Sequence, residues 1–471
     1  MHMNLDSRKL SALRIERSDM RKFYQKKNNP VIANCEVRSR TQSGVNVSVT
    51  GLFRLRVNPT IACALAMTLL LTFSAFAQPS PDSPPWIKLN GYVRSDIFFD
   101  SRETINAVNG LFLFFPAPEN RLDDGKDANN QPSLTMLAVT SRLNVTFRTP
   151  DILNAKVNGR IEGDFTLYSG GTTMRLRHAY GQLAWENTEL LLGQTWIPAF
   201  VENCVPTVVG LATGAPYQEF ARNPQIRLTQ RVGKTELLAA VVSQMDYASP
   251  GPEGASPVYM RRAVVPEIDL GASFGNNHWL VGLLGSVKTL KPRTYTENQE
   301  TNEKFNTSEM LTTFSVKGYG KYYREKWELK AGATYGENIS ENLMQGGYGV
   351  STRDSLTGKE QYTASSGIYS WLNFVYGKTW QGSLTLCYGQ NFGFDKPLYP
   401  NNNLIWGRGL DIEKMYRIVP CLFYNIRKFQ LALEYELNTA YYGTINFQNG
   451  RVENSHPITN HRVAFATTFF F

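Results

Sequence analysis

The sequence predicts an all-β protein whose fold is a transmembrane antiparallel β-barrel of about 16 strands, within a range of roughly 14 to 18. Three observations predict this fold. Apolar and polar residues alternate with period two in many short segments, the links between these segments are short and long in turn, and a segment typical of a signal peptide precedes them. A soluble sandwich also alternates, but it has no reason to sort its links by length.

The composition agrees with this class. Of the 471 residues, 19% are charged and 12% are aromatic, and the charged fraction lies below the roughly 25% of ordinary soluble domains. The mean hydropathy is −0.31. Outside the segment near residue 70, no apolar run reaches the about 20 residues that a membrane helix needs, which argues against a helical membrane protein.

The basic charge of the chain lies in its first part. The net charge is +9, and almost all of it comes from the residues before position 57. A basic protein often binds nucleic acid, but these basic residues belong to a segment that we expect to be removed. We therefore expect no nucleic-acid partner.

Residues 1–77 are predicted to be a leader that ends in a cleavable signal peptide. Arg54 and Arg56 form its positive segment, residues 61–76 its apolar segment, and Ala77 the small residue before the cut. The alternative is an uncleaved anchor, but four prolines follow the cleavage site at once. Export through this peptide predicts a location in the bacterial outer membrane.

The parts on either side of the predicted cut are interpreted separately. Residues 1–50 are longer than the usual positive segment and are either an over-extended start or a flexible leader. Residues 78–471 are predicted to form a single transmembrane barrel.

Three cysteines remain in residues 78–471, namely Cys204, Cys387 and Cys421. The last two fall on neighbouring predicted strands, where they either pair as a disulfide or pack as free thiols.

The alternation begins directly after the signal peptide. In residues 87–99, Ile87 and Leu89 fall on one face, and Lys88 and Asn90 fall on the other. The same pattern recurs down the chain with turn residues between the segments. The predicted strands are residues 87–99, 142–148, 156–165, 174–185, 188–196, 224–231, 235–244, 266–274, 279–287, 311–322, 327–336, 367–377, 381–389, 415–424, 429–438 and 462–471.

The links between these strands alternate in length, as the two sides of a membrane barrel require. The short links are centred on residues 150–151, 186–187, 233–234, 276–277, 324–325, 378–379 and 427–428. The long links are residues 100–138, the shorter 166–173, then 197–223, 245–265, 288–310, 337–366, 390–414 and 439–461.

Aromatic residues mark the strand ends and the C-terminus. Val463, Phe465, Phe469 and Phe471 occupy alternate positions at the end of the chain, which resembles the terminal signature of outer-membrane barrels. That likeness implies a partner, the barrel assembly machinery, that binds through Phe471. The aromatics beside the short links are expected to contact the outer-membrane lipids as two interfacial girdles.

One long link differs from the others in composition. A barrel of about 16 strands is too wide for wall side chains to fill, so something must set the width of its aqueous lumen. The loop 197–223 is rich in proline, glycine and apolar residues, and we expect it to fold inward as a constriction. The alternative is an external loop that packs on its neighbours or on another subunit. The candidate constriction residues are Phe200, Glu202, Cys204 and Glu219.

Three short segments resemble a known family. They read Arg175-Leu176-Arg177-His178-Ala179-Tyr180, Leu192-Gly193-Gln194-Thr195-Trp196 and Asn223-Pro224-Gln225-Ile226-Arg227. They are similar to the dicarboxylate-type (DcaP-like) porins, and the likeness covers the predicted strands four to six. In general porins the loop after the fifth strand narrows the pore, and 197–223 is the matching loop. The resemblance implies passive diffusion of small hydrophilic solutes, with anion or dicarboxylate preference, through a homotrimer.

The polar faces of strands two to six are rich in arginine. If these faces line the lumen, they form a basic wall that concentrates anions. In the alternative, the charges pair with acids across the strands. Arg175 and Arg177 both face the lumen only if a β-bulge lies near His178. The candidate pore-lining residues are Arg142, Arg148, Arg160, Glu162, Asp164, Arg175, Arg177 and Arg227, with Lys156 on the same faces.

The candidate catalytic residues of the sequence are weak. H-E-x-x-H is absent, and His456 and His461 form only a weak constellation with Ser455 in a predicted loop. We expect no enzyme activity, no cofactor and no metal. The predicted strands begin too soon after the leader for a plug domain. The alternative function is an adhesin or structural barrel that acts through its long external loops.

Overall fold

The structure is a computed structural model that describes residues 85–168, 172–298 and 300–471. The chain divides into two units, 1–57 and 58–471, and all the described residues belong to the second unit. The predicted leader and signal peptide, residues 1–77, lie outside the described residues.

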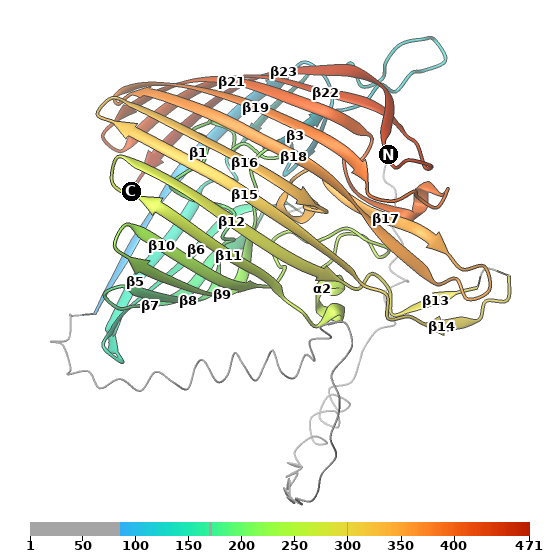
Figure 1. Ribbon diagram of the computed structural model, residues 1–471. Coiled ribbons are helices and arrows are strands. Elements are labelled where there is room, and N and C mark those ends of the chain that lie inside the picture. Colours follow the sequence, from blue (N-terminus) through green and yellow to red (C-terminus); the bar gives the residue numbers. More distant parts are fainter. Residues whose placement is uncertain (1–84, 169–171, 299) are drawn as a thin grey trace, which may run out of the picture. The chain divides into compact units, whose positions relative to one another are not determined.

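Antiparallel strands form a closed barrel of 16 members, which confirms the predicted fold class (Figure 1). The sheet closes because the first strand pairs with the last on one side, with Tyr92 opposite Phe470, and with the second wall strand on the other, with Trp86 opposite Arg148. The wall strands are β1 (Trp86–Asp100), β5 (Arg142–Ile152), β6 (Ala155–Tyr168), β7 (Thr172–Ala184), β8 (Thr188–Trp196), β9 (Arg222–Val232), β10 (Thr235–Val242), β11 (Glu267–Gly275), β12 (Trp279–Leu290), β15 (Leu311–Arg324), β16 (Trp327–Glu337), β18 (Glu360–Gly377), β19 (Trp380–Phe394), β21 (Ile412–Ile426), β22 (Phe429–Ile445) and β23 (Val452–Phe470).

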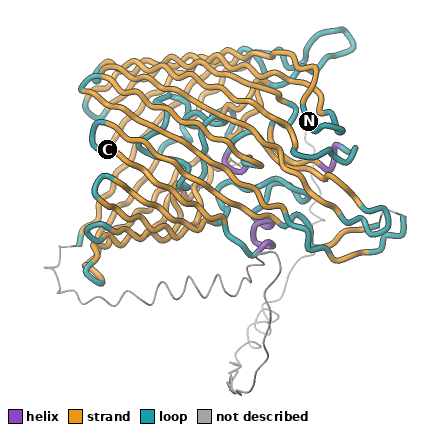
Figure 2. The backbone as a smooth tube through the Cα atoms, in the orientation of Figure 1, coloured by secondary structure: helices purple, strands orange, loops and turns teal. Residues whose placement is uncertain are grey.

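The remaining elements are short and lie in the long links. Figure 2 shows the few helical turns in purple against a wall of orange strands. Within the described ranges, no helix is long and apolar enough to cross a membrane. These elements are β2 (Thr104–Ala107), β3 (Phe112–Pro116), β4 (Ser133–Leu137), α2 (Val258–Ala263), β13 (Tyr295–Glu297), β14 (Lys304–Asn306), η1 (Ser340–Asn342), β17 (Gly346–Arg353), η2 (Asn402–Leu404) and β20 (Ile405–Arg408).

Short turns and long loops alternate around the barrel, with three corrections to the predicted boundaries. The predicted long link 166–173 is mostly strand, since β6 runs to Tyr168 and β7 begins at Thr172. The first turn lies at Leu153 and Asn154 rather than at 150–151, because these two residues adopt positive φ angles of 52° and 58°, as a tight hairpin turn requires. The predicted loop 439–461 is mostly strand, since β22 runs to Ile445 and β23 begins at Val452.

The wall has its apolar side chains outside and its polar side chains inside. Ile87 and Leu89 on β1 are 78% and 65% exposed, whereas Asp96 on the same strand is buried. This inverts the pattern of a soluble protein and suits a barrel surrounded by hydrocarbon, where all backbone groups must pair within the sheet. Aromatic rings meet beside the turns, as in the Trp380–Tyr424 contact at 4.6 Å.

The largest buried apolar cluster lies within the barrel. It joins residues of three long loops to inward-facing side chains of the wall. We name two of these loops L1 (101–132, after β1) and L3 (197–221, after β8), and the third is the loop after β16, which contributes Ile339. Phe112 of L1, Phe220 of L3 and Trp371 of β18 all belong to the cluster. L1 and L3 therefore fold inward and form an apolar core together with the third loop.

Candidate functional site

L3 leaves the wall at the end of β8 and reaches the opposite side of the barrel. Its Cys204 Sγ donates to the Gly320 carbonyl on β15 at 3.2 Å. Thr207 contacts β18, where its N–H donates to Asn373 Oδ1 at 3.1 Å. Because β15 and β18 lie far around the sheet from β8, these contacts place L3 across the interior.

Two further wall side chains fix Thr207. Ser383 Oγ on β19 donates to the Thr207 carbonyl at 2.5 Å, and Lys330 Nζ on β16 donates to Thr207 Oγ1 at 2.8 Å. The amide, carbonyl and hydroxyl of this residue are thus all bonded to the barrel. Hydrogen bonds from a charged donor such as Lys330 are among the stronger ones in proteins.

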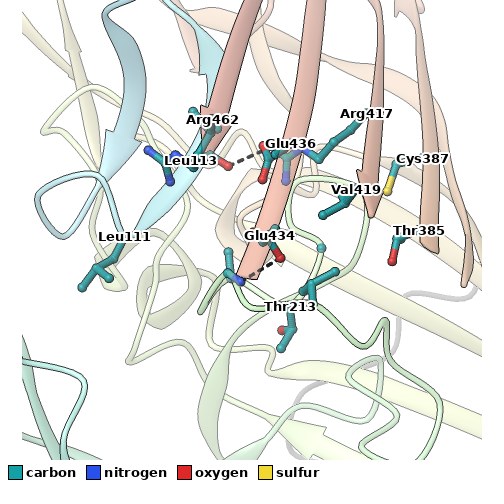
Figure 3. Close-up of a pocket in the computed structure, with 14 residues that line it drawn as sticks. Leu111, Leu113, Thr213, Thr385, Cys387, Arg417, Val419, Glu434, Glu436 and Arg462 are labelled. Carbon is teal, nitrogen blue, oxygen red and sulfur yellow. Dashed lines mark hydrogen bonds and ion pairs between the residues drawn. The ribbon is translucent and has the colours of Figure 1, made fainter. Parts of the chain in front are cut away.

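Charged side chains hold the next turn of L3. Glu434 Oε2 on β22 accepts the backbone N–H groups of Val209 and Gly210 at 2.6 and 3.2 Å, and Arg94 on β1 donates to the Val209 carbonyl at 2.7 Å. A small pocket lies between this part of L3 and the wall (Figure 3). Figure 3 shows Arg417 and Glu436 directed toward one another on its far side.

The returning limb of L3 is anchored by Glu219. Lys317 Nζ on β15 and Thr334 Oγ1 on β16 each donate to its carboxylate at 2.5 Å. The neighbouring Gln218 accepts a bond from Trp371 Nε1 at 2.8 Å. A buried carboxylate with two donors is well compensated for its loss of water.

The four candidate constriction residues have different environments. Phe200 stacks on Trp196 at 3.8 Å, and Cys204 and Glu219 are buried against the wall. Glu202 is exposed, and it lies within electrostatic range of Arg227 on β9. Burial raises the pKa of the Cys204 thiol.

A cluster of arginines and acids lines the wall opposite the L3 anchors. Glu162 on β6 is shared by three guanidinium groups. Arg177 Nε lies 2.8 Å and Arg142 Nε 3.2 Å from Glu162 Oε1, while Arg160 binds Oε2. Only 1% of the Glu162 side chain is exposed, so its charge is compensated by these groups rather than by water.

Two further acids complete this cluster. Asp164 binds Arg177 at 2.7 Å and Arg175 at 3.4 Å, and Asp246 binds Arg222 at 2.6 Å and Arg175 at 3.4 Å. We name the eight residues the arginine cluster: Arg142, Arg160, Glu162, Asp164, Arg175, Arg177, Arg222 and Asp246. Five cations and three anions leave an excess of two positive charges.

A β-bulge brings Arg175, Arg177 and His178 to the same side of β7. The register shifts here, since Glu162 is opposite His178 but the next residue, Gly163, is opposite Leu176. The extra residue on β7 changes the phase of the strand. The bulge predicted from the sequence is confirmed.

The remaining pore candidates lie closer to the short turns. Arg148 pairs with Asp151 at 3.3 Å. Arg227 faces the interior on β9 and, in the described part of the chain, makes no ion pair within 4 Å. Lys156 is exposed on β6. Most arginines thus pair with acids, as the alternative interpretation stated, but the acids are too few for all of them.

The cysteines and histidines of the described residues make structural contacts. Cys387 and Cys421 are free thiols, because Cys387 is opposite Arg417 on the neighbouring strand and Cys421 is opposite Ser383. His456 and His461 lie on β23, not in a loop, and His461 Nδ1 contacts Tyr435 Oη at 2.7 Å. Ser455 donates to Glu413 rather than to a histidine. Within the described ranges, no group of metal-binding side chains is present.

Sequence reasoning missed the role of L1 and of the wall residues that anchor the loops. The sequence predicts only that 100–138 is a long link, although L1 contains the run Phe112-Leu113-Phe114-Phe115, whose phenylalanines are at most 1% exposed. That run was the available signal. Arg222, which lies over the Trp196 ring at 4.5 Å, was also missed, because nothing in its local sequence marks it.

The barrel and its inserted loop define a class of fold. A closed antiparallel barrel of 16 strands, with a loop packed across its interior, is the porin type of outer-membrane barrel. The chain is similar in structure to the outer membrane channel DcaP of Acinetobacter baumannii, with a TM-score of 0.59 and 18% identity over 84% of this chain and 100% of that one.

Two other solved structures have lower similarity. OmpT of Vibrio cholerae, described as an outer membrane protein, has a TM-score of 0.50 and 9% identity over 84% of this chain and all of that one. OmpF of Salmonella typhi has a TM-score of 0.47 and 10% identity over 82% of this chain and 97% of that one. No family model matches the chain, and no curated protein matches it in sequence.

Proposed function

We propose that the protein is an outer-membrane channel for passive diffusion of small hydrophilic solutes, with a preference for anions. The observation that carries this proposal is the division of the barrel interior between two arcs. L3 is bonded to the arc that runs from β15 to β1, whereas the arginine cluster lies on β5 to β9 and the adjoining loops. The side chains of Arg160 and Arg142 remain 26% and 17% exposed there.

In this proposal L3 is the constriction of the pore. Its anchors at Thr207, Val209 and Glu219 fix its distance from the basic arc, so that solutes pass between the two. Glu202 on L3 is one of the acids whose charge acts on Arg227 of β9. Opposed charges at a narrow point select solutes by charge and dipole, and the excess of cations sets the sign.

The test is a measurement of current in planar lipid bilayers. A KCl gradient is expected to give a reversal potential on the anion-selective side, and a panel of small dicarboxylates, monocarboxylates and sugars would show which solutes enter. Blocking by dicarboxylates at lower concentration than by monocarboxylates would support the dicarboxylate preference. Cation selectivity would contradict the basic arc as the selectivity element.

The location and assembly of the protein follow from the same proposal. Export would remove residues 1–77, and the barrel would then be inserted by the assembly machinery through Phe471, with its apolar face against outer-membrane lipids. We propose a homotrimer of such barrels. N-terminal sequencing of the mature protein should begin at Gln78, and cross-linking in detergent should stop at three chains. We infer no catalytic activity, because Ser455 is bonded to Glu413 and not to a histidine.

The second candidate function is an adhesin or structural barrel. The long loops carry extra structure, including the hairpin of β13 and β14, which Figure 1 shows at the edge of the molecule next to β17. A folded barrel that carries no current in bilayers would favour this function over a channel.

A further inference from the structure

L1 contains a hairpin that is buried although it belongs to a long external link. Its strands β2 and β3 pair with each other, with Thr104 opposite Pro116, and are not part of the barrel sheet. Phe112 and Phe114 are fully buried and Phe115 is 1% exposed. An external loop in water has no reason to bury three phenylalanines, so this hairpin fills space within the barrel.

The hairpin packs directly on L3. The rings of Phe112 and Phe220 meet edge to face with centroids 5.3 Å apart. Phe220 in turn contacts Trp196 and Phe200, so L1 continues the aromatic packing of L3. The two loops share one apolar cluster, and neither could lose its partner without exposing large rings.

Arg417 on β21 bonds to both loops and to the wall. Its Nη1 donates to the Ala215 carbonyl of L3 at 2.9 Å, and its Nη2 donates to the carbonyls of Leu113 and Phe114 of L1 at 2.9 and 3.0 Å. Nε lies 3.0 Å from Glu436 Oε1 on β22. Arg417 contacts three carbonyls and one carboxylate, and its planar guanidinium carries five N–H donors. Lysine has only three N–H donors on a single nitrogen, so it could not make the same set.

Other wall residues hold the hairpin by its backbone carbonyls. Asn438 donates to Phe114 O at 3.2 Å and Tyr442 donates to Pro116 O at 2.7 Å. Arg462, which is paired with Asp100, donates to Gly110 O at 2.7 Å. All these donors lie on β22 and β23, the same side of the barrel that binds the tip of L3.

We propose that the β2–β3 hairpin of L1 is a second constriction element, and that Arg417 is the positioning residue that holds this hairpin and L3 as one insert against the wall. The hairpin occupies the lumen on the side of β21 to β23, and it confines the aqueous path to the arc that carries the arginine cluster. This inference rests on the proposed channel function. It adds the element that limits the width of the aqueous path on the side of β21 to β23.

The first test removes the hairpin. Because Thr104 and Pro116 are paired, residues 105–115 can be replaced by two glycines without displacing the ends of L1. The single-channel conductance should rise roughly twofold relative to the full chain, since a wider aqueous path conducts more ions. Unchanged conductance in a folded barrel would overturn the hairpin as a constriction element.

The second test removes the contacts by which Arg417 holds L1 and L3 against the wall. Arg417→Met combined with Glu436→Gln takes away both charges and leaves no unpaired buried carboxylate. This variant should show frequent transitions between conductance levels, which Arg451→Met, a change at an exposed loop residue, should not show. Steady currents equal to those of the unchanged protein would contradict the positioning role.

A third readout does not depend on current. Chymotrypsin cleaves after phenylalanine, and Phe112 and Phe114 are inaccessible while the hairpin is seated. In detergent-folded protein, the Arg417→Met, Glu436→Gln variant should be cut in L1, whereas Arg451→Met and the unchanged chain should resist. Resistance of the double variant would overturn the inference. If the unchanged barrel passes no current but shows this cleavage pattern, the channel function fails and the role of Arg417 stands.

Discussion

Arg177 pairs with two buried acids of the arginine cluster. Its side chain is 2% exposed and binds Glu162 and Asp164 at 2.8 and 2.7 Å. The β-bulge of β7 turns this side chain toward the interior. Removal of Arg177 leaves two buried carboxylates short of donors. We therefore expect Arg177 to stabilise the fold.

Substituting Arg177→Met is expected to lower the free energy of unfolding by about 3–5 kcal/mol, because it breaks a buried ion-paired network from one side. Urea unfolding of the barrel in lipid vesicles measures this. The matched control is Arg231→Met, whose side chain is 54% exposed and whose loss should cost under about 1 kcal/mol. Equal losses in the two variants would contradict the structural role of Arg177.

Arg227 should act on selectivity with little effect on stability. It faces the interior without an ion pair in the described part of the chain and lies near Glu202. Arg227→Gln is expected to reduce the anion-to-cation permeability ratio by roughly twofold, since it removes one of the few uncompensated cations along the path. Reversal potentials measure the ratio, with Arg451→Gln as the control. An unchanged ratio would place the selecting charges elsewhere.

The Cys204 thiol should be unreactive in the folded protein. It is fully buried, it donates to the Gly320 carbonyl, and burial raises its pKa, so little thiolate forms and none is accessible. A maleimide at pH 8 should label Cys204 only after unfolding in denaturant. Labelling of the native barrel at this residue would show that L3 separates from the wall in solution.

L3 behaves as an element held by its backbone rather than by its own secondary structure. Glu434 alone accepts two of its N–H groups. Glu434→Leu should leave both groups buried without a partner, at about 1–3 kcal/mol each, and should increase the current noise of the open channel. Glu434→Gln keeps one acceptor oxygen, so its current noise should lie between that of the unchanged protein and that of Glu434→Leu. Noise that is the same in all three proteins would contradict the anchoring role of this carboxylate.

Elements of the wall could be predicted from sequence, and the inserts could not. All the wall strands alternate locally, so residues such as Ile87 and Lys88 reveal their faces without knowledge of the rest of the chain. The bulge at Arg177 was also readable, because the phase of the arginines conflicts with that of Leu183. The anchors of L3 were not readable, since Thr207 binds residues more than a hundred positions away. L1 was missed because its phenylalanine run has no period.

At the scale of the whole molecule, closure depends on the last strand. β23 pairs with β22 on one side and with β1 on the other, and the Phe471 N–H donates to the Gly91 carbonyl at 3.1 Å. Deleting residues 463–471 would leave two sheet edges unpaired in hydrocarbon, where each unsatisfied backbone group costs several kcal/mol. The deletion should abolish the SDS-resistant folded form on an unheated gel, and Phe471→Ala alone should retain it once folded in vitro. A folded form without these residues would contradict the closure.

The inserted loops also divide the protein into two parts whose sequences can change separately, the barrel wall and the material inside it. The sequence of the wall is constrained by the membrane, because its side chains must alternate between apolar and polar. The sequence of the loops inside the barrel is constrained only by the solutes that should pass. L1 and L3 meet the wall largely through backbone carbonyls and amides, which any sequence of similar shape supplies. A new permeability could therefore arise by replacing L1 and L3 while the barrel wall stays unchanged.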